Sequence, residues 1–207
     1  MARMPEAERL QLISEPDRAL WAEGCVLAGL DEVGRGPLAG PVVVACCAMP
    51  SEPLIPYVND SKKLSEKRRI QVEAQIRELA LGYHLAWIGP DIIDEINILQ
   101  ATRRAFEEAY RGMPIAVTDV MIDAMNGLKI DAKQHVIIHG DAQCYSIAAA
   151  SILAKVTRDD YMEQMAKEYP QYGFEIHKAY GTKAHYEGIE GHGITPIHRK
   201  SFLKNIL

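Results

Sequence analysis

Short apolar runs alternate with longer amphipathic segments along this chain of 207 residues. Apolar runs that end in glycine, proline or a polar cluster are typical of strands, whereas apolar residues that recur every three or four positions are typical of helices. On these grounds we expect five strands, at residues 25–32, 41–49, 83–88, 117–125 and 135–139. The connection between the first two strands is short and rich in glycine and proline, so this pair is expected to be antiparallel.

Helical spacing occurs in the segments between and around these strands. It predicts helices at residues 5–22, 65–81, 91–111 and 142–168, and a short helix near 183–190 in a loop-rich tail. Ser65 stands where an N-cap is expected. The helix at 91–111 is expected to be continuous, with an inner face that carries Ile92, Ile96, Leu99, Phe106 and Tyr110. Small residues at 146–151 would let the last long helix approach a sheet closely. Because repeats and low-complexity linkers are absent, we expect one α/β domain over residues 1–207, with a five-stranded mixed sheet.

Composition adds little to this picture. The chain is 48% hydrophobic and 25% charged, which is ordinary for a soluble globular protein. Its net charge of -5 does not indicate a nucleic-acid-binding protein, although residues 62–69 form a local basic patch. The four cysteines, Cys25, Cys46, Cys47 and Cys144, lack the spacing of a zinc site and favour a reducing compartment. No apolar run approaches the ~20 residues of a membrane helix, so we expect a cytoplasmic protein that does not contact membranes.

Four acidic residues come at or just after the ends of predicted strands. Asp31 and Glu32 end the first strand, Asp123 ends the fourth, and Asp141 follows the fifth. Ligand sites in open α/β sheets form at the carboxyl ends of strands, so these side chains are expected to converge. Neighbouring strand residues point to opposite faces, so Asp31 and Glu32 would share a site only if the chain bends at Glu32. Converging carboxylates suit Mg²⁺ or Mn²⁺, and two such ions about 4 Å apart can drive phosphodiester hydrolysis.

Each of these acids also has a purely structural interpretation. Asp141 stands directly before a helix and would alone be read as its N-cap. Asp123 would alone be read equally well as a turn residue at a strand end. The pair Asp31-Glu32 is harder to explain structurally, because the strand before it is apolar and an unusual Gly-Pro-rich turn follows it. The joint pattern therefore favours a metal site more than any single residue does.

At this point the sequence resembles bacterial ribonuclease HII, a type 2 ribonuclease H. Six stretches carry the resemblance, in the order of that family, between about residue 25 and residue 202. They are residues 31–41 (DEVGRGPLAGP), 60–64 (DSKKL), 97–102 (NILQAT), 146–155 (SIAAASILAK), 177–182 (HKAYGT) and 195–199 (TPIHR).

The resemblance implies a ribonuclease H-like fold with a small C-terminal part of helices and loops, and residues 1–24 as an N-terminal helix. It implies an endonuclease that hydrolyses the RNA strand of RNA–DNA hybrids. Such an enzyme also nicks on the 5′ side of single ribonucleotides in duplex DNA, leaving 3′-hydroxyl and 5′-phosphate ends, and takes part in ribonucleotide removal from DNA. The implied partners are these nucleic acids, and we expect a monomer.

The same resemblance assigns roles to particular residues. Asp31, Glu32, Asp123 and Asp141 would be catalytic and would hold Mg²⁺ or Mn²⁺. The backbone of Gly34, Arg35 and Gly36 would read the ribose 2′-hydroxyl, which distinguishes RNA from DNA. Tyr180, in a C-terminal substrate-binding segment at 170–207, would pack against the following deoxyribose. Ser61, Lys62 and Lys63 would contact phosphate.

Some positions leave alternatives open. Without the resemblance, Tyr180 would be read as a surface aromatic, and each lysine equally well as a solvated residue. His177, His185, His192 and His198 are read as ordinary hydrogen-bonded histidines. Ala124 and Ala179 stand where the family usually has glycine, and a positive φ at either position would penalise alanine.

Three other functions fit these residues less well. Ribonuclease HIII usually has lysine at the position of Arg35 and an N-terminal domain larger than the residues that precede the first strand here. A non-catalytic binding module would be expected to lack at least one of the four acids. A nucleotide-binding P-loop requires a Gly-Lys-Ser/Thr ending, which residues 34–40 lack. Residues 202–207 are too short to diagnose a tail that binds a sliding clamp.

Overall fold

A five-stranded mixed sheet forms the centre of the computed structural model, which describes residues 4–204. The strands are β1 (Leu27–Val33), β2 (Val42–Ala48), β3 (Gly82–Ile88), β4 (Asp119–Asp123) and β5 (Lys133–Ile137), in the order β3-β2-β1-β4-β5. β2 pairs antiparallel with β1 and β3, whereas β4 pairs parallel with β1 and β5. The predicted mixed sheet and the antiparallel first pair are confirmed. The expected segments at 1–24 and 170–207 include residues 1–3 and 205–207, which lie outside the described residues.

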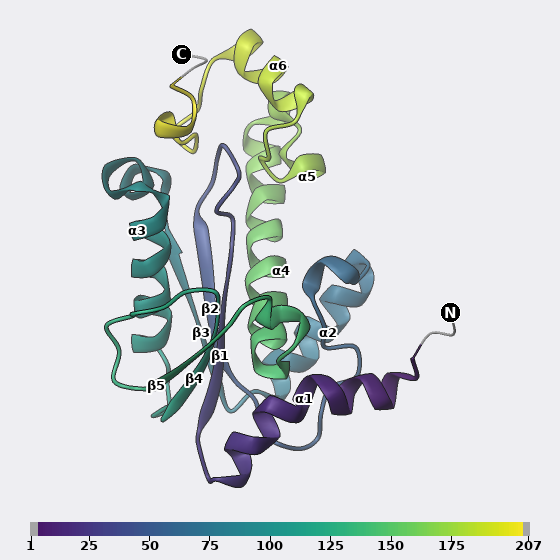
Figure 1. The fold of residues 1–207 in the computed structure, drawn as a ribbon. Helices are drawn as coiled ribbons and strands as arrows, with labels where there is room; N and C mark the ends of the chain where they lie inside the picture. The colour runs from purple at the N-terminus through teal and green to yellow at the C-terminus, as the bar shows by residue number, and fades with distance from the viewer. Residues whose placement is uncertain (1–3, 205–207) are drawn as a thin grey trace.

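Helices cover both faces of the sheet (Figure 1). They are α1 (Glu6–Ala22), α2 (Glu66–Leu79), α3 (Pro90–Arg111), α4 (Tyr145–Glu168), α5 (Phe174–His177) and α6 (Lys183–His192). Alternate residues of β2 pack against α3 on one face and against α4 on the other, so every residue of this strand is buried. This explains why its sequence is continuously apolar rather than alternating.

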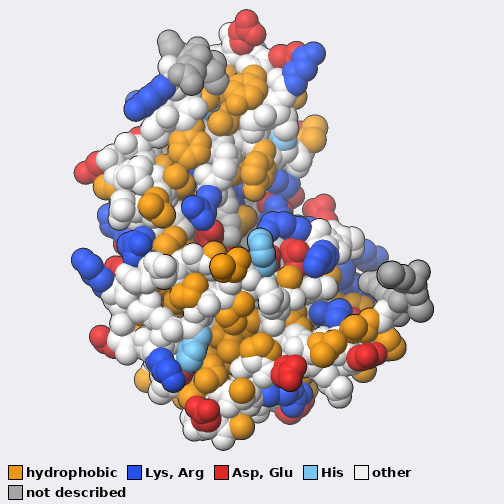
Figure 2. Space-filling view, in the orientation of Figure 1, with side chains coloured by type: hydrophobic (Ala, Val, Ile, Leu, Met, Phe, Trp, Pro, Cys, Tyr) orange, Lys and Arg blue, Asp and Glu red, His pale blue; other side chains and the backbone are white. Residues whose placement is uncertain are grey.

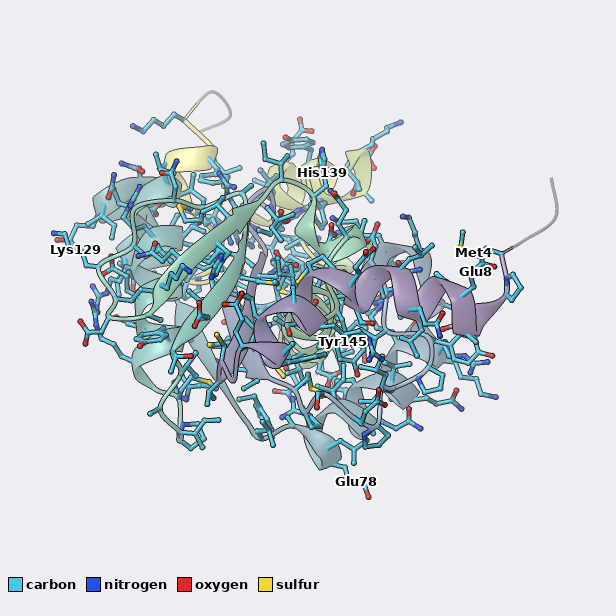
Figure 3. All side chains as sticks on the ribbon, turned by 60° about the horizontal axis from the view of Figure 1, so that its bottom comes forward. Met4, Glu8, Glu78, Lys129, His139 and Tyr145 are labelled. Atoms are coloured by element: carbon cyan, nitrogen blue, oxygen red, sulfur yellow. The ribbon has the colours of Figure 1, made fainter. Side chains whose placement is uncertain are left out.

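The central helix α4 lies unusually close to β1. A Cβ atom at Gly29 of β1 would collide with the backbone of Ser146 in the first turn of α4. The small residues at 146–151 are all buried at this contact, as the sequence indicated. The N-terminal helix α1 crosses the start of α4, and Figure 3 shows Tyr145 beneath it. Close packing of this kind fixes α4 relative to the strand that carries Asp31 and Glu32.

The segment at 91–111 is not one continuous helix. Asn97 interrupts it with φ 66° and ψ 164°, and its side-chain oxygen accepts hydrogen bonds from the amides of Leu99 and Gln100. Asn97 therefore acts as an N-cap for the second half, which favours a break over a continued helix. The break also changes the buried face: Leu99 is 47% exposed, whereas Ile93, Ala101 and Ala105 are buried. The predicted inner position of Leu99 was wrong.

Other element boundaries shift by a few residues. β4 is shorter than the predicted strand at 117–125, and β5 begins at Lys133 because this residue pairs with Asp119. Two of the five residues of β5 are exposed and the other three are partly buried. The last long helix starts at Tyr145, after a 3₁₀ turn at Gly140–Ala142. The predicted cap at Ser65 is confirmed, since its hydroxyl accepts from the amide of Arg68.

The C-terminal part packs against the second half of α4. Leu38, Met162, Phe174 and Leu203 belong to one buried cluster that joins α4, α5 and the chain end to the loop after β1. Figure 1 shows this part beyond one end of the sheet, the end where β1 leads into its loop. Within residues 4–204, no helix is long and apolar enough to cross a membrane.

Candidate active site

A cavity of about 230 Å³ lies where β1 and β4 end. Asp31, Glu32 and Asp123 line it from these two strands. The remaining lining residues are Val33 of β1 and, from three other segments, Ser61, Lys62, Ser151, Lys155 and Tyr180. Figure 2 shows acidic and basic side chains close together across the middle of the molecule, between the C-terminal part and the body below it. Three of the four acids expected to converge therefore line one cavity, whereas Asp141 is not among its lining residues, although its charge acts on Asp31.

Asp31 and Glu32 both reach this cavity from β1. The pairing of β1 with β2 continues in regular register through Asp31, Glu32 and Val33, so no bulge marks the bend expected at Glu32. The pairing with β4, by contrast, stops at Leu30. The amide of Glu32 instead donates to Asp31 Oδ1 at 2.8 Å, which holds the Asp31 carboxylate beside the open edge of β1. Asp31 and Glu32 can share one site because β1 has no paired strand on its β4 side at these two residues.

The carboxylates repel one another. Burial raises the pKa of Asp31 well above its ordinary value, and the nearby charge of Glu32 raises it further. Burial also raises the pKa of Glu32, and the hydrogen bond from Arg35 Nη1, at 3.1 Å, lowers it. Burial also raises the pKa of Asp141, and the charge of Asp60 raises it further. A bound cation would relieve this repulsion.

The donor chemistry fits a hard divalent cation, because carboxylate oxygens are the ligands that Mg²⁺ and Mn²⁺ prefer. In the part of the chain that the structure describes, however, no three His, Cys, Asp or Glu side chains are placed to hold a metal ion as they stand. Glu32 is paired with Arg35, Asp123 Oδ1 accepts the amide of Gly140 at 3.0 Å, and Asp141 lies 3.6 Å from Lys62 Nζ. These carboxylates would turn from their present partners toward an ion.

Asp141 is not the N-cap of α4. That position is served by Asp17 of α1, whose carboxylate accepts the amides of Tyr145 and Ser146 at 3.0 and 2.9 Å. Asp141 lies instead in the 3₁₀ turn before α4, where Lys62 faces it. The structural alternative for Asp141 is therefore excluded. Asp123, in contrast, combines its place in the cavity with a structural bond to Gly140.

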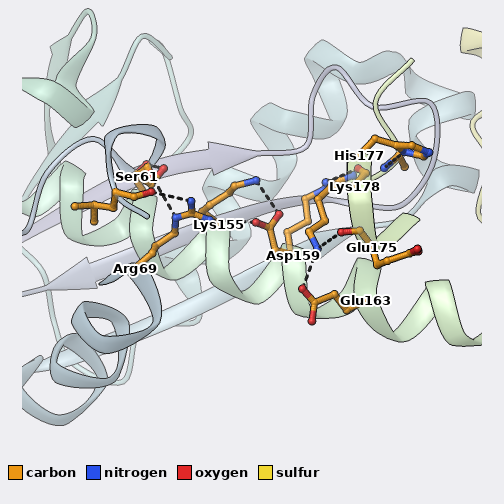
Figure 4. Close-up of polar contacts among 12 residues, drawn as sticks. Ser61, Arg69, Lys155, Asp159, Glu163, Glu175, His177 and Lys178 are labelled. Atoms are coloured by element: carbon orange, nitrogen blue, oxygen red, sulfur yellow. Dashed lines mark hydrogen bonds and ion pairs between the residues drawn. The ribbon is translucent and has the colours of Figure 1, made fainter. Parts of the chain in front are cut away.

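The segment with Ser61, Lys62 and Lys63 reaches the cavity only in part. Ser61 is buried and its hydroxyl is 3.1 Å from that of Ser151, while Lys62 is exposed beside Asp141. Lys63 faces Asp60 and borders surface hollows next to α1, not the cavity. Arg69 of α2 fixes this segment by donating to the carbonyls of Ser61 and Leu64 (Figure 4).

Gly36 and Tyr180 lie next to each other at the rim. A Cβ at Gly36 would be 3.6 Å from the Tyr180 ring, which is 45% exposed. Gly34 has φ 90°, and a Cβ there would collide with Arg158, so only glycine fits. Ala124 and Ala179 adopt the positive φ values, 50° and 67°, that penalise alanine.

The sequence interpretation missed Ser151 and Lys155, which α4 directs into the cavity. Lys155 Nζ is 2.8 Å from Asp159 Oδ1, and burial lowers the pKa of this lysine (Figure 4). Their signal was available: Ser151, Lys155 and Arg158 recur at helical spacing in the largely apolar first part of α4. The chain end holds a further missed residue, Arg199, which is fully buried.

Three of the four histidines near the chain end, His177, His185 and His198, are hydrogen-bonded as expected, and His192 makes a ring contact with Tyr172. His198 Nδ1 accepts the amide of Thr195 at 2.9 Å, and its Nε2 lies 3.1 Å from that of His185. Burial lowers the pKa of His198 to about 4 and also lowers that of His185. His177 is bonded to the carbonyl of Tyr172 and to the amide of Ala179.

Comparison with known proteins shows which family and fold this chain is similar to. The family model described as Ribonuclease HII matches residues 28–205. Ribonuclease HII of Clostridioides difficile is 50% identical over 203 residues, which cover 98% of this chain and 80% of that protein. The crystal structure of ribonuclease H2 from Pyrococcus horikoshii OT3 superposes with a TM-score of 0.71 at 26% identity, over 84% of this chain and 92% of the other. The structure of Bst-RNase HIII in complex with Mn²⁺ shares the fold, with a TM-score of 0.60 at 17% identity over 92% and 67% of the two chains.

Proposed function

The chain belongs to the ribonuclease HII family, and we propose on this basis that it nicks duplex DNA on the 5′ side of an embedded ribonucleotide. It is an endonuclease that hydrolyses the RNA strand of RNA–DNA hybrids. The products carry 3′-hydroxyl and 5′-phosphate ends, and the enzyme acts in the removal of ribonucleotides from DNA. The nucleic acids are its substrates. A monomeric state and a cytoplasmic location are further parts of the proposal, and the free cysteines support the second.

One observation carries the proposal most directly: an acidic cavity directly adjoins a glycine loop and an exposed tyrosine. We assign Asp31, Glu32, Asp123 and Asp141 as the residues that hold a divalent ion. The family depends on divalent metals, and the oxygen donors favour Mg²⁺ or Mn²⁺ for this chain. When bound, such an ion supplies an activated water and stabilises the leaving oxygen.

The remaining side chains would bind and orient the nucleic acid. Lys62 and Lys155 place positive charge beside the acids, where the scissile phosphate must lie. Arg35 and Gly36 are exposed and their backbone is open to the ribose, Gly34 is buried directly before them, and Tyr180 offers a flat apolar surface to the next sugar. Residues 61–64 form what we call the phosphate-binding segment. Within it, the buried Ser61 supports Lys62, and Lys63 would contact a phosphate farther along the duplex.

The test is a DNA duplex with a single ribonucleotide, incubated with the protein with and without Mg²⁺ or Mn²⁺. We expect one nick on the 5′ side of the ribonucleotide, and only when the metal is present. Asp31→Asn and Asp123→Asn should abolish it, while Glu8→Gln, on the exposed surface of α1, should not. A nick that persists in both aspartate variants, or its absence from the unmodified protein, would refute the proposal. Comparison with a duplex that holds four or more ribonucleotides would show which substrate is preferred.

A further inference from the structure

Two fully buried arginines lie behind the loop of residues 34–41, which connects β1 to β2. Arg199 comes from the chain end and Arg158 from α4. Within residues 4–204, no carboxylate lies within 4.0 Å of either guanidinium group, although buried cations are normally paired. Burial of a cation without a carboxylate partner costs free energy. The hydrogen-bond partners of the two arginines show what these side chains do in the structure.

Every hydrogen bond from these two side chains goes to a backbone carbonyl. Arg199 donates to Gly34, Arg35 and Gly40, at 2.6, 3.0 and 2.9 Å. Arg158 donates to the carbonyls of Ala39 and Pro41, at 3.1 and 3.0 Å, and to that of Lys178, at 3.2 Å. Five carbonyls of one loop therefore point inward. The sixth belongs to the segment that leads to Tyr180.

The direction of these carbonyls fixes the direction of the amides. In a trans peptide the C=O and the following N–H point in opposite directions. Because the carbonyls of Gly34 and Arg35 face the buried Arg199, the N–H groups of Arg35 and Gly36 point away from it. Both residues are exposed, and neither amide donates to any acceptor in the described part of the chain. Two adjacent free donors thus face outward beside the Tyr180 ring.

We propose that Arg199 is a positioning residue that aims the amides of Arg35 and Gly36 at the ribose 2′-hydroxyl, and that Arg158 holds the loop against the Tyr180 segment. This inference rests on the proposed function, because it explains how the loop recognises a ribose. The planar fork of an arginine spans two successive carbonyls, which a lysine ammonium cannot do from one position. Discrimination between ribose and deoxyribose therefore depends on a residue that touches no substrate.

The test compares two duplexes that differ only in one 2′-hydroxyl. Their dissociation constants are measured without divalent metal, so that neither duplex is cut. For Arg199→Lys we expect the preference for the ribonucleotide duplex to fall about tenfold, which corresponds to about 1.4 kcal/mol, roughly one or two hydrogen bonds. Binding of the all-DNA duplex should change little.

Arg69→Lys is the matched control, because Arg69 also donates to two loop carbonyls, but in the phosphate-binding segment. It should weaken binding of both duplexes equally and leave the preference intact. An unchanged preference in Arg199→Lys, or equal weakening of both duplexes, would overturn the inference. If the unmodified protein fails to nick the ribonucleotide duplex with Mg²⁺, the proposed function itself fails, and the two results are distinguishable.

A measurement on the unmodified protein covers the case in which Arg199→Lys does not fold, as judged by its thermal melting. The amide resonances of Arg35 and Gly36 should shift when the ribonucleotide duplex is added, and shift much less with the all-DNA duplex. Equal shifts with both duplexes would show that these amides do not sense the 2′-hydroxyl.

Discussion

The acidic cavity is lined by Asp31, Glu32 and Asp123, whose negative charges repel one another. The adjoining loop at 34–41, in contrast, covers two buried arginines that donate hydrogen bonds to backbone carbonyls. Both regions contain buried ionisable groups. In the acidic cavity these groups lack enough partners and are open to a ligand. In the loop, each guanidinium donates to three acceptors and is closed to solvent. The difference indicates that buried charges with too few hydrogen-bond partners mark the reacting centre. Buried charges whose hydrogen bonds are all made belong to its frame, by which we mean the buried contacts that hold the loop at 34–41, α4 and the C-terminal part in place.

Substitution in the acidic cavity should separate activity from stability. Asp31→Asn is expected to lower the nicking rate by roughly a thousandfold, about 4 kcal/mol, because it removes a ligand of the ion. In metal-free buffer the free energy of unfolding should rise by about 1 kcal/mol, because a charge that burial and Glu32 destabilise is gone. Single-turnover kinetics and urea unfolding measure the two effects. A variant that loses both activity and stability would contradict the comparison.

Substitution in the frame should have the opposite balance. Arg158→Met leaves the carbonyls of Ala39, Pro41 and Lys178 without their donor, and we expect a loss of about 3 kcal/mol in unfolding free energy. Arg104→Met, at an exposed pair with Glu108, is the matched control and should leave the unfolding free energy nearly unchanged. Urea unfolding of both variants decides the matter. Equal stabilities would show that the buried guanidinium is not part of the frame.

The frame should also fail at low pH before the cavity does. His198 has a folded-state pKa of about 4, below its ordinary value of 6.5, so the unfolded chain binds the extra proton more readily. The neutral imidazole of His198 therefore stabilises the folded state above pH 6.5, and this stabilisation is lost as the pH falls toward 4. Between pH 7 and pH 5 we expect a loss of about 2 kcal/mol, with His185 adding in the same direction. Urea titrations over this range should show the slope.

His198→Gln removes this titration, and His139→Gln, at an exposed histidine, does not. The slope should therefore flatten in the first variant and persist in the second. A slope that is the same in both would assign the pH dependence to other groups.

The sequence predicted the cavity better than the frame. Asp31, Glu32 and Asp123 stand out because carboxylates end apolar strands, and a buried strand leaves few other reasons for them. The roles of Gly34 and of the small residues of α4 could be predicted equally well, because two backbone segments can approach closely only where the side chains are small. The strands themselves follow from apolar runs, since both faces of the sheet are covered.

The frame depends on contacts between residues far apart in the chain, which no local pattern encodes. Arg199 meets Gly34, and Asp17 caps α4 from α1, although each looks like an ordinary surface residue in the sequence. Asn97 shows the same limit on a smaller scale. Its neighbours follow a helical period, but its own side chain offers the amides of Leu99 and Gln100 an alternative to the helix. Local spacing identifies the elements and the reacting groups, whereas the partners that hold them depend on the completed fold.

The two alanines with positive φ provide the smallest and most exact test of the comparison. Ala124 follows Asp123 in the cavity region and is exposed, so Ala124→Gly should relieve strain without loss of packing and stabilise the protein by about 0.5–1 kcal/mol. Ala179 is equally strained, but its methyl group is fully buried in the frame against Phe174 and its neighbours. Ala179→Gly loses that burial, worth about 1 kcal/mol, and should leave stability nearly unchanged. Urea unfolding of both variants measures the difference, and equal gains would mean that the frame is packed no more tightly than the cavity rim.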